Sequence, residues 1–147
     1  MEESLTEAIR EQFDLHPQEA SEYSPLVLAW IGDVVYELTL RTMLISGGNR
    51  PVDKLNRADS RLARAGAQSA MADALLPVMS EEEQNIYKRG RNAHSYTKAK
   101  SATTGEYRRA TGFEAVIGYL YLKGRYRRLE ELIAVGIKSL QTGKTDE

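Results

Sequence analysis

The most constraining feature of this sequence is a long apolar stretch over residues 26–45 that contains three charged residues, Asp33, Glu37 and Arg41. A Ser-Pro pair precedes it, typical of an N-cap followed by a first helical residue, so we predict a helix over about 24–45. A membrane span is excluded, because an Asp or Arg at a bilayer centre costs roughly 2.5–3.5 kcal/mol. The helix is apolar almost all round, and we therefore expect it to be central in a globular core.

Most of the remaining chain also has helical patterns. Capping boxes at Ser4 and Ser80, each with a Glu three residues later, predict short helices that begin there. Apolar residues at helical spacing predict further helices that begin at Pro51 and over about 65–76, 106–122 and 126–141. No β-type alternation persists and no repeat is found. We predict an all-α chain with an acidic N-terminal helix or arm (1–22), one domain (23–141) and a polar tail (142–147).

Composition limits the possible chemistry. The chain has 147 residues, no Cys and only two His, which excludes disulfides, thiolate metal sites, a cysteine nucleophile and a multi-histidine metal centre. Metal chemistry would therefore depend on carboxylate oxygens. The acidic start is not followed by an apolar secretory segment, so we expect a cytoplasmic protein with no membrane attachment.

The charges are unevenly distributed. Residues 1–22 hold seven acids and one base, whereas residues 50–128 hold sixteen bases and eight acids. This asymmetry suggests a polyanionic partner for the basic part of the chain. The counts alone are equally compatible with a solvated surface of mixed charge.

Two acids lie within the most apolar helices. Asp33 and Glu114 are each flanked by apolar residues, and a carboxylate in such a setting is costly unless it is hydrogen-bonded, paired or bound to a metal. Where the two helices pack, both acids could converge on a hard cation such as Mg²⁺. A carboxylate-held cation beside a basic surface favours phosphodiester hydrolysis.

A purely structural role is the alternative for these acids. Glu37 and Arg41 have the i, i+4 spacing of an ion pair within one helix, and we favour that interpretation of Glu37. Glu114 has no comparable local base, and Gly118 leaves open space one turn away. We therefore favour a functional role for Asp33 and Glu114.

Two motifs carry a resemblance to a known family. The segments Leu28-Ala-Trp-Ile-Gly-Asp-Val-Val-Tyr-Glu37 and Phe113-Glu-Ala-Val-Ile-Gly-Tyr-Leu-Tyr-Leu122 resemble the two acidic helices of the ribonuclease III family. The segment Lys88-Arg-Gly-Arg-Asn-Ala93 is similar to the Mini-ribonuclease III branch, which has no double-stranded RNA-binding domain. The resemblance covers about residues 24–140.

The resemblance implies a homodimeric, Mg²⁺-dependent endonuclease of double-stranded RNA that acts on precursors of large-subunit (23S) ribosomal RNA. Asp33 would be the catalytic aspartate and Glu114 the metal-binding glutamate, both contacting Mg²⁺. An accessory ribosomal protein is a further partner that the resemblance allows. Three acids of ordinary ribonuclease III are replaced here by Leu26, Ala29 and Thr111. We therefore expect fewer direct metal ligands and more water. A catalytically inactive RNA-binding module and a helical protein–protein adaptor are the alternative functions.

The predicted RNA contacts lie in and beside a polar loop over residues 92–105. Segment 88–109 has seven bases and one acid, and duplex RNA is recognised through phosphates and 2′-hydroxyls. The predicted RNA-binding residues are Lys88, Arg89, Arg91, Asn92, His94, Lys98, Lys100, Arg108 and Arg109. A second basic group could line the same groove or be an exposed helix face: Arg50, Lys54, Arg57, Arg61 and Arg64.

Overall fold

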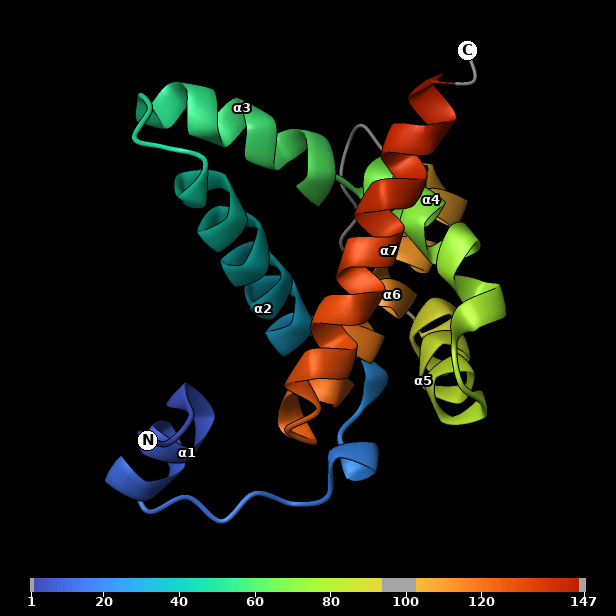
Figure 1. Ribbon diagram of the computed structural model, residues 1–147. Coiled ribbons are helices and arrows are strands. Elements are labelled where there is room, and N and C mark those ends of the chain that lie inside the picture. The colour runs from blue at the N-terminus through green and yellow to red at the C-terminus, as the bar shows by residue number, and fades with distance from the viewer. Residues whose placement is uncertain (1, 94–102, 146–147) are drawn as a thin grey trace.

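The computed structural model describes residues 2–93 and 103–145, and all regular structure in these ranges is helical. This confirms the all-α prediction (Figure 1). The α-helices are α1 (Leu5–Gln12), α2 (Pro25–Ser46), α3 (Val52–Ala63), α4 (Ala65–Leu75), α5 (Glu81–Asn92), α6 (Thr104–Leu122) and α7 (Tyr126–Thr145). Short 3₁₀ turns occur at Ala20–Glu22 and Leu76–Val78. None of the helices in these ranges is long and apolar enough to cross a membrane.

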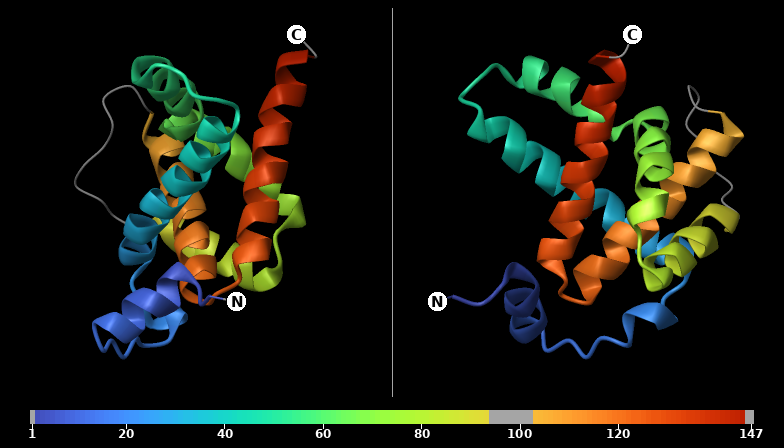
Figure 2. Two further views of the ribbon diagram at one scale, coloured as in Figure 1. Left: turned by 60° about the vertical axis from the view of Figure 1, so that its left-hand side comes forward. Right: turned by 45° about the vertical axis from the view of Figure 1, so that its right-hand side comes forward.

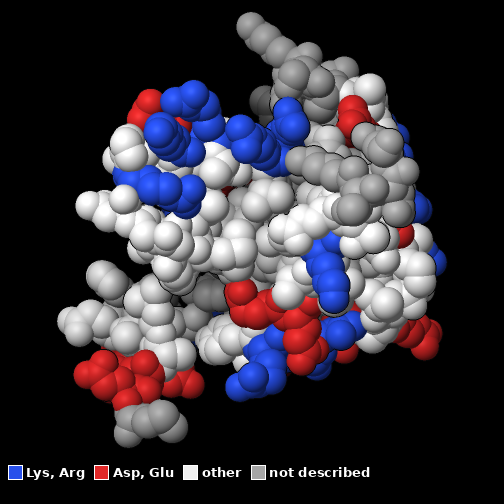
Figure 3. Space-filling view, turned by 45° about the horizontal axis from the view of Figure 1, so that its top comes forward, with Lys and Arg blue, Asp and Glu red and all other residues white. Residues whose placement is uncertain are grey.

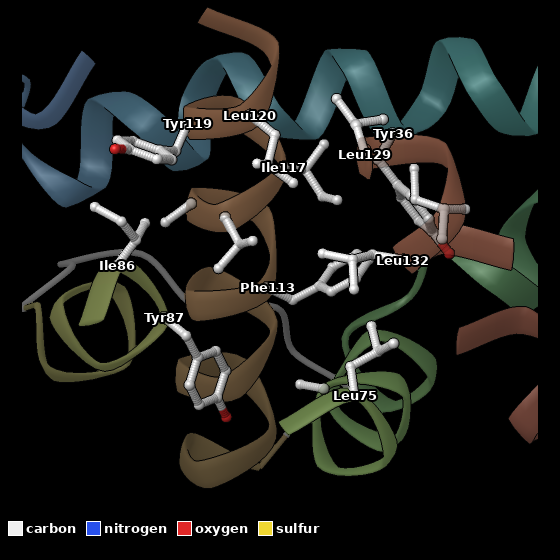
Figure 4. Packing of buried hydrophobic residues seen from close by; sticks show 14 of the residues in the cluster. Tyr36, Leu75, Ile86, Tyr87, Phe113, Ile117, Tyr119, Leu120, Leu129 and Leu132 are labelled. Atoms are coloured by element: carbon white, nitrogen blue, oxygen red, sulfur yellow. The ribbon is translucent and has the colours of Figure 1, made fainter. Parts of the chain in front are cut away.

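Helix α6 is the centre of the core. It packs against α2, α4, α5 and α7, and its residues 115–120 are almost completely buried. Figure 4 shows side chains of these neighbours around it, including an edge-on contact between Tyr36 and Phe113 with ring centroids 5.2 Å apart. The prediction that the helix over 24–45 is central is wrong. One side of α2 is buried against α6, but Trp30 on its outer side is 77% exposed.

Glycines allow α2 and α6 to cross at very short distance. A Cβ atom on Gly32 would lie 1.8 Å from the backbone oxygen of Glu114, and one on Gly118 would lie 1.9 Å from that of Leu28. Real Cβ atoms do not approach backbone so closely, so only glycine fits at both positions. The open space that we expected at Gly118 is therefore filled by the α2 backbone. The same contact brings Asp33, next to Gly32, toward Glu114.

A buried ion pair joins α5 to α7. Glu83, 3% exposed, accepts hydrogen bonds of 2.9 Å from Nε and Nη2 of Arg128. Glu83 also closes the predicted capping box with Ser80, which confirms where α5 begins. The Arg128 guanidinium holds the pKa of Glu83 below its usual value. Arg128, which the sequence does not distinguish from other surface bases, thus has a structural role.

The ends of the chain differ from the predicted boundaries. Helix α7 continues to Thr145, whereas we expected a polar tail from 142. The helix break after α3 falls at Arg64, which is extended, and the Ala-rich helix runs unbroken through Gly66. Helix α1 forms from its capping box and lies at one end of the molecule, with the C-terminus at the other (Figures 1 and 2).

We expect Gly118→Ala to destabilise the protein strongly, because the new methyl group forces α2 away from α6. The loss should exceed the roughly 1–3 kcal/mol typical of an overpacked core, measured by denaturant unfolding. Gly105→Ala on the same helix is the control. Its Cβ would meet only the tip of the Arg109 side chain, at 3.3 Å, so its stability should be near that of the parent. Equal stability of the two variants would contradict the close crossing.

Candidate active site

The structure brings Asp33 and Glu114 together. The carboxyl group of Glu114 on α6 lies close enough to that of Asp33 on α2 to interact with it. Burial, followed by this interaction with Asp33, raises the pKa of Glu114 to about 9. Glu114 is half-buried, whereas Asp33 is exposed although apolar residues flank it in sequence. An exposed acid next to a half-buried one leaves this pair accessible to a large substrate.

Gln68 of α4 completes the inner side of this pair. It is 3% exposed, its Nε2 donates to the backbone oxygen of Ala63 at 2.7 Å, and its side chain lowers the pKa of Glu114 against the effect of burial. Its Oε1 atom is buried and has no hydrogen-bond partner. Sequence reasoning missed Gln68. A polar residue amid the alanines of 65–76 is the only signal that could have found it.

A second pair of acids lies one helical turn further along α2. Burial, followed by the interaction with the Asp59 carboxyl of α3, raises the pKa of Glu37. The predicted ion pair is confirmed, since Arg41 Nε lies 3.2 Å from Glu37 Oε2. Asp59 is 8% exposed, and its Oδ1 has no partner. Sequence reasoning missed Asp59, which lies among the bases of α3.

The acids fit a hydrated divalent cation better than a cage of protein ligands. Within residues 2–93 and 103–145, no three His, Asp or Glu side chains come together as a metal-binding group. Mg²⁺ usually keeps several waters and binds through only one or two carboxylates. The Asp33–Glu114 pair offers two carboxylates, and Gln68 adds an amide oxygen that has no partner in this structure. These oxygen donors suit Mg²⁺.

The predicted RNA-binding residues fall into three groups. Lys88, Asn92 and Arg108 are exposed. Three others contact the protein itself: Arg89 donates to the backbone oxygens of residues 21 and 23, Arg91 lies over the Tyr87 ring, and Arg109 donates to Ser69 Oγ at 2.6 Å. His94, Lys98 and Lys100 lie outside the described residues. The structure therefore leaves the RNA-contact prediction as a prediction, with Lys88 and Arg108 among the exposed bases.

The basic residues of α3 form an exposed face. Lys54, Arg57 and Arg61 are all exposed, as are Arg50 and Arg64 at its ends. Figure 3 shows Lys and Arg side chains gathered over α3, whereas acids gather on α1 at the far end of this view. Asp59 lies on the opposite side of α3, toward Glu37, so the basic face of α3 points away from that contact.

Pocket geometry also distinguishes this site from a small-molecule site. A groove of about 980 Å³ lies between α3, α4 and α7, with Arg61, Arg64 and Glu106 among its lining residues. Neither Asp33 nor Glu114 lines it. Asp33 of the acid pair is exposed, so the pair is accessible to a large substrate from that side.

Comparison with known proteins identifies the family. The model of the ribonuclease III domain matches residues 26–125, which include both acidic helices. The chain belongs to the ribonuclease III family. It is 42% identical over 118 residues to the Mini-ribonuclease 3 of Thermoanaerobacter sp., covering 80% of this chain and 83% of that protein. It is 43% identical over 131 residues to the Mini-ribonuclease 3 of Clostridium tetani, covering 88% and 87%.

A crystal structure of a similar protein has the same fold as this chain. A protein from Fusobacterium nucleatum superposes with a TM-score of 0.76 at 31% identity, covering 83% of this chain and 99% of that one. The ribonuclease III fold is thereby confirmed, and the chain is an endoribonuclease. The segment before residue 26, with α1, lies outside the matched domain.

The pKa of Glu114 makes a prediction about stability in a metal-free buffer. Between its unfolded value near 4.5 and about 9, folded Glu114 keeps a proton that the unfolded chain has lost, so stability falls as pH rises. Glu114→Gln removes this penalty. Its stability should match the parent near pH 4.5 and exceed it progressively toward pH 9, by at most roughly 1.4 kcal/mol per pH unit. Urea unfolding in EDTA tests this, and a pH-independent difference would contradict the raised pKa.

Proposed function

We propose that this protein is a Mg²⁺-dependent cytoplasmic endoribonuclease that cleaves double-stranded RNA in the maturation of the 23S ribosomal RNA precursor. The observation that carries this proposal is the Asp33–Glu114 pair, in which Asp33 is exposed and Glu114 is half-buried. The ribosomal RNA substrate, and an accessory ribosomal protein as a possible partner, rest on the similarity to Mini-ribonucleases 3.

Asp33 and Glu114 are the proposed ligands of Mg²⁺. When bound, the cation would supply polarisation of the phosphoryl group, a lowered pKa for water and neutralisation of charge at the leaving oxygen. Glu114 must give up its proton to act as a ligand, and Gln68 favours this because its side chain stabilises the charged carboxylate. Asp33, which is exposed, faces the substrate side of the pair.

The bases around the acids are the proposed RNA contacts. Binding of phosphate oxygens requires exposed cationic side chains. Lys88 near the end of α5 and Arg108 near the start of α6 are exposed cations, and so are Lys54, Arg57 and Arg61 on α3. A basic surface suits duplex RNA, which is recognised mainly by shape and through its phosphates and 2′-hydroxyls. The remaining predicted loop residues, His94, Lys98 and Lys100, belong to the same proposal.

Homodimerisation is supported by a row of exposed apolar side chains on the outer side of α2. Trp30, Val34 and Leu38 recur at i, i+4 spacing and are 77%, 61% and 57% exposed. Large contiguous apolar patches on a soluble protein mark interaction sites. Met43 on the same helix is also exposed, whereas Tyr36 and Leu40 are fully buried in the core of the same chain.

Asp33→Asn should abolish Mg²⁺-dependent cleavage of duplex RNA while leaving duplex binding largely intact. The amide keeps the size of the side chain but removes the charge that a cation needs. Gel-based cleavage assays and filter binding on the same preparation measure the two properties. Asp53→Asn, which changes an exposed acid on α3, is the control and should cut at the parental rate. An active Asp33→Asn variant would refute the site, and an inactive parent would favour the non-catalytic RNA-binding module.

Trp30→Lys should convert a dimer into a monomer at micromolar concentration, because a charge in the centre of the apolar row would be buried without a partner. Light scattering measures the mass. Val135→Lys on α7, where the side chain is 46% exposed, is the matched control and should leave the mass unchanged. A monomeric parent would rule out the α2 interface.

A further inference from the structure

Helix α1 leaves its apolar side exposed. Leu5, Ile9 and the C-cap residue Phe13 recur at i, i+4 spacing and are 65%, 39% and 70% exposed, whereas Thr6 is buried. A helix of 8 residues is marginal in water and depends mainly on the packing of its apolar face. We therefore expect a surface outside this chain to cover the apolar side of α1.

Helix α1 and the segment around it are also acidic. Residues 1–22 hold seven acids and one base. Glu3, Glu7 and Glu11 recur at i, i+4 spacing, where like charges destabilise a helix. The neighbouring Glu11 carboxyl raises the pKa of Glu3, as expected when acids are crowded together. A surface that receives α1 should therefore be apolar in the middle and basic at its edge.

The groove between α3, α4 and α7 has both properties. Its volume is about 980 Å³, and Leu62 and Ile137 are among the apolar residues that line it. Arg61 and Arg64 also line it and are exposed, and Glu106 is the acid in its lining. Two turns of α-helix, with about 1.5 Å rise per residue and a diameter of about 10 Å, have a volume of the same order. The groove can therefore receive a short, acidic, amphipathic helix.

The groove is continuous with the face of α2 that is proposed for dimerisation. A second hollow of about 480 Å³ lies between α2 and α7. It shares Met43 and Ile137 with the groove, and Leu38 of the exposed α2 row lines it as well. A second copy that covers the α2 row therefore also lies beside the groove.

Charge indicates which end of the second copy lies there. Helix α1 is at the end of the molecule where α2 begins, and α3 is at the end where α2 stops (Figures 1 and 2). Acids gather on α1 and bases over α3 (Figure 3). In a two-fold dimer both copies contribute the same patch. Two antiparallel α2 helices place the acidic α1 of each copy beside the basic α3 of the other, whereas two parallel helices place like charges together.

We propose that α1 of one copy packs into the groove of a second copy, with its apolar side against the apolar lining and its acids beside Arg61 and Arg64. Because the interface is two-fold, each copy holds the α1 helix of the other. The inference rests on the proposed homodimer and adds a second contact to it, made by a segment outside the matched ribonuclease III domain. Lys54 and Arg57, which do not line the groove, stay open to RNA.

Disulfide cross-linking tests the proposal, because the chain has no Cys. Ile9→Cys and Ala70→Cys, the second of which lies in the groove lining, are prepared with tags of different mass, mixed and oxidised. We expect a disulfide-linked pair with one chain of each variant on a non-reducing gel. Val135→Cys, which is exposed on α7 outside the groove lining, is the control partner for Ile9→Cys and should give little of this product. Equal yields with the two partners would overturn the proposal.

The double variant Ile9→Cys/Ala70→Cys shows whose helix fills the groove. We expect cross-linked dimers, and a disulfide within one chain, which keeps the mass monomeric, would overturn the proposal. Light scattering of the parent separates this inference from the proposed homodimer. A monomeric parent would refute both, whereas a dimeric parent without the Ile9–Ala70 disulfide would refute the α1 contact alone.

Dimer affinity gives a second readout. Ile9→Lys should raise the dissociation constant of the dimer at least about tenfold, because each dimer buries two of these side chains. Circular dichroism should show an unchanged fold, since Ile9 is exposed in its own chain. Gln18→Lys makes the same charge change in the exposed segment after α1 and is the control. A dimer of Ile9→Lys as tight as that of Gln18→Lys would contradict the α1 contact.

Discussion

The contact on which this structure depends is the glycine-lined crossing of α2 and α6. At Gly32 and at Gly118, backbone atoms of the other helix occupy the space that a Cβ atom would need. The two helices therefore approach closely enough for short acidic side chains to meet across the interface. Without this approach, Asp33 and Glu114 would each be a charged side chain on its own helix, and no paired site would exist.

The same crossing explains the electrostatics of the site. Packing α6 in the middle of the core buries Glu114 on one side, and its neighbour Asp33 is another acid, so its pKa rises to about 9. Burial of a charge costs free energy that hydrophobic packing of α6 must offset. Natural proteins accept such a cost mainly where function needs it. The stability that α6 gains from its aliphatic neighbours is thus the condition for placing an acid there.

Much of the fold could be predicted from the sequence because its signals are local. Capping boxes at Ser4 and Ser80 and the apolar periodicity of 106–122 each act within a few residues, and the helices begin close to the predicted positions. Asp33 and Glu114 were predictable because each stands out against apolar neighbours. Gln68 and Asp59 were not, because their importance comes from helices that are far away in sequence. The same reason hides Arg128, which looks like a surface base until Glu83 is placed opposite it.

Helix α2 shows why its apolar pattern led to the wrong prediction that this helix is central in the core. One face packs on α6, a second carries Asp33 and Glu37, and a third carries the exposed row of Trp30, Val34 and Leu38. A helix that serves three neighbours has apolar residues on most sides, and in sequence this is indistinguishable from a helix buried all round. If a second copy covers the third face, the acid row lies at the edge of that interface. Dimerisation and catalysis then depend on the same rigid helix, α2. A substitution on either of these two faces therefore changes the surroundings of the residues on the other.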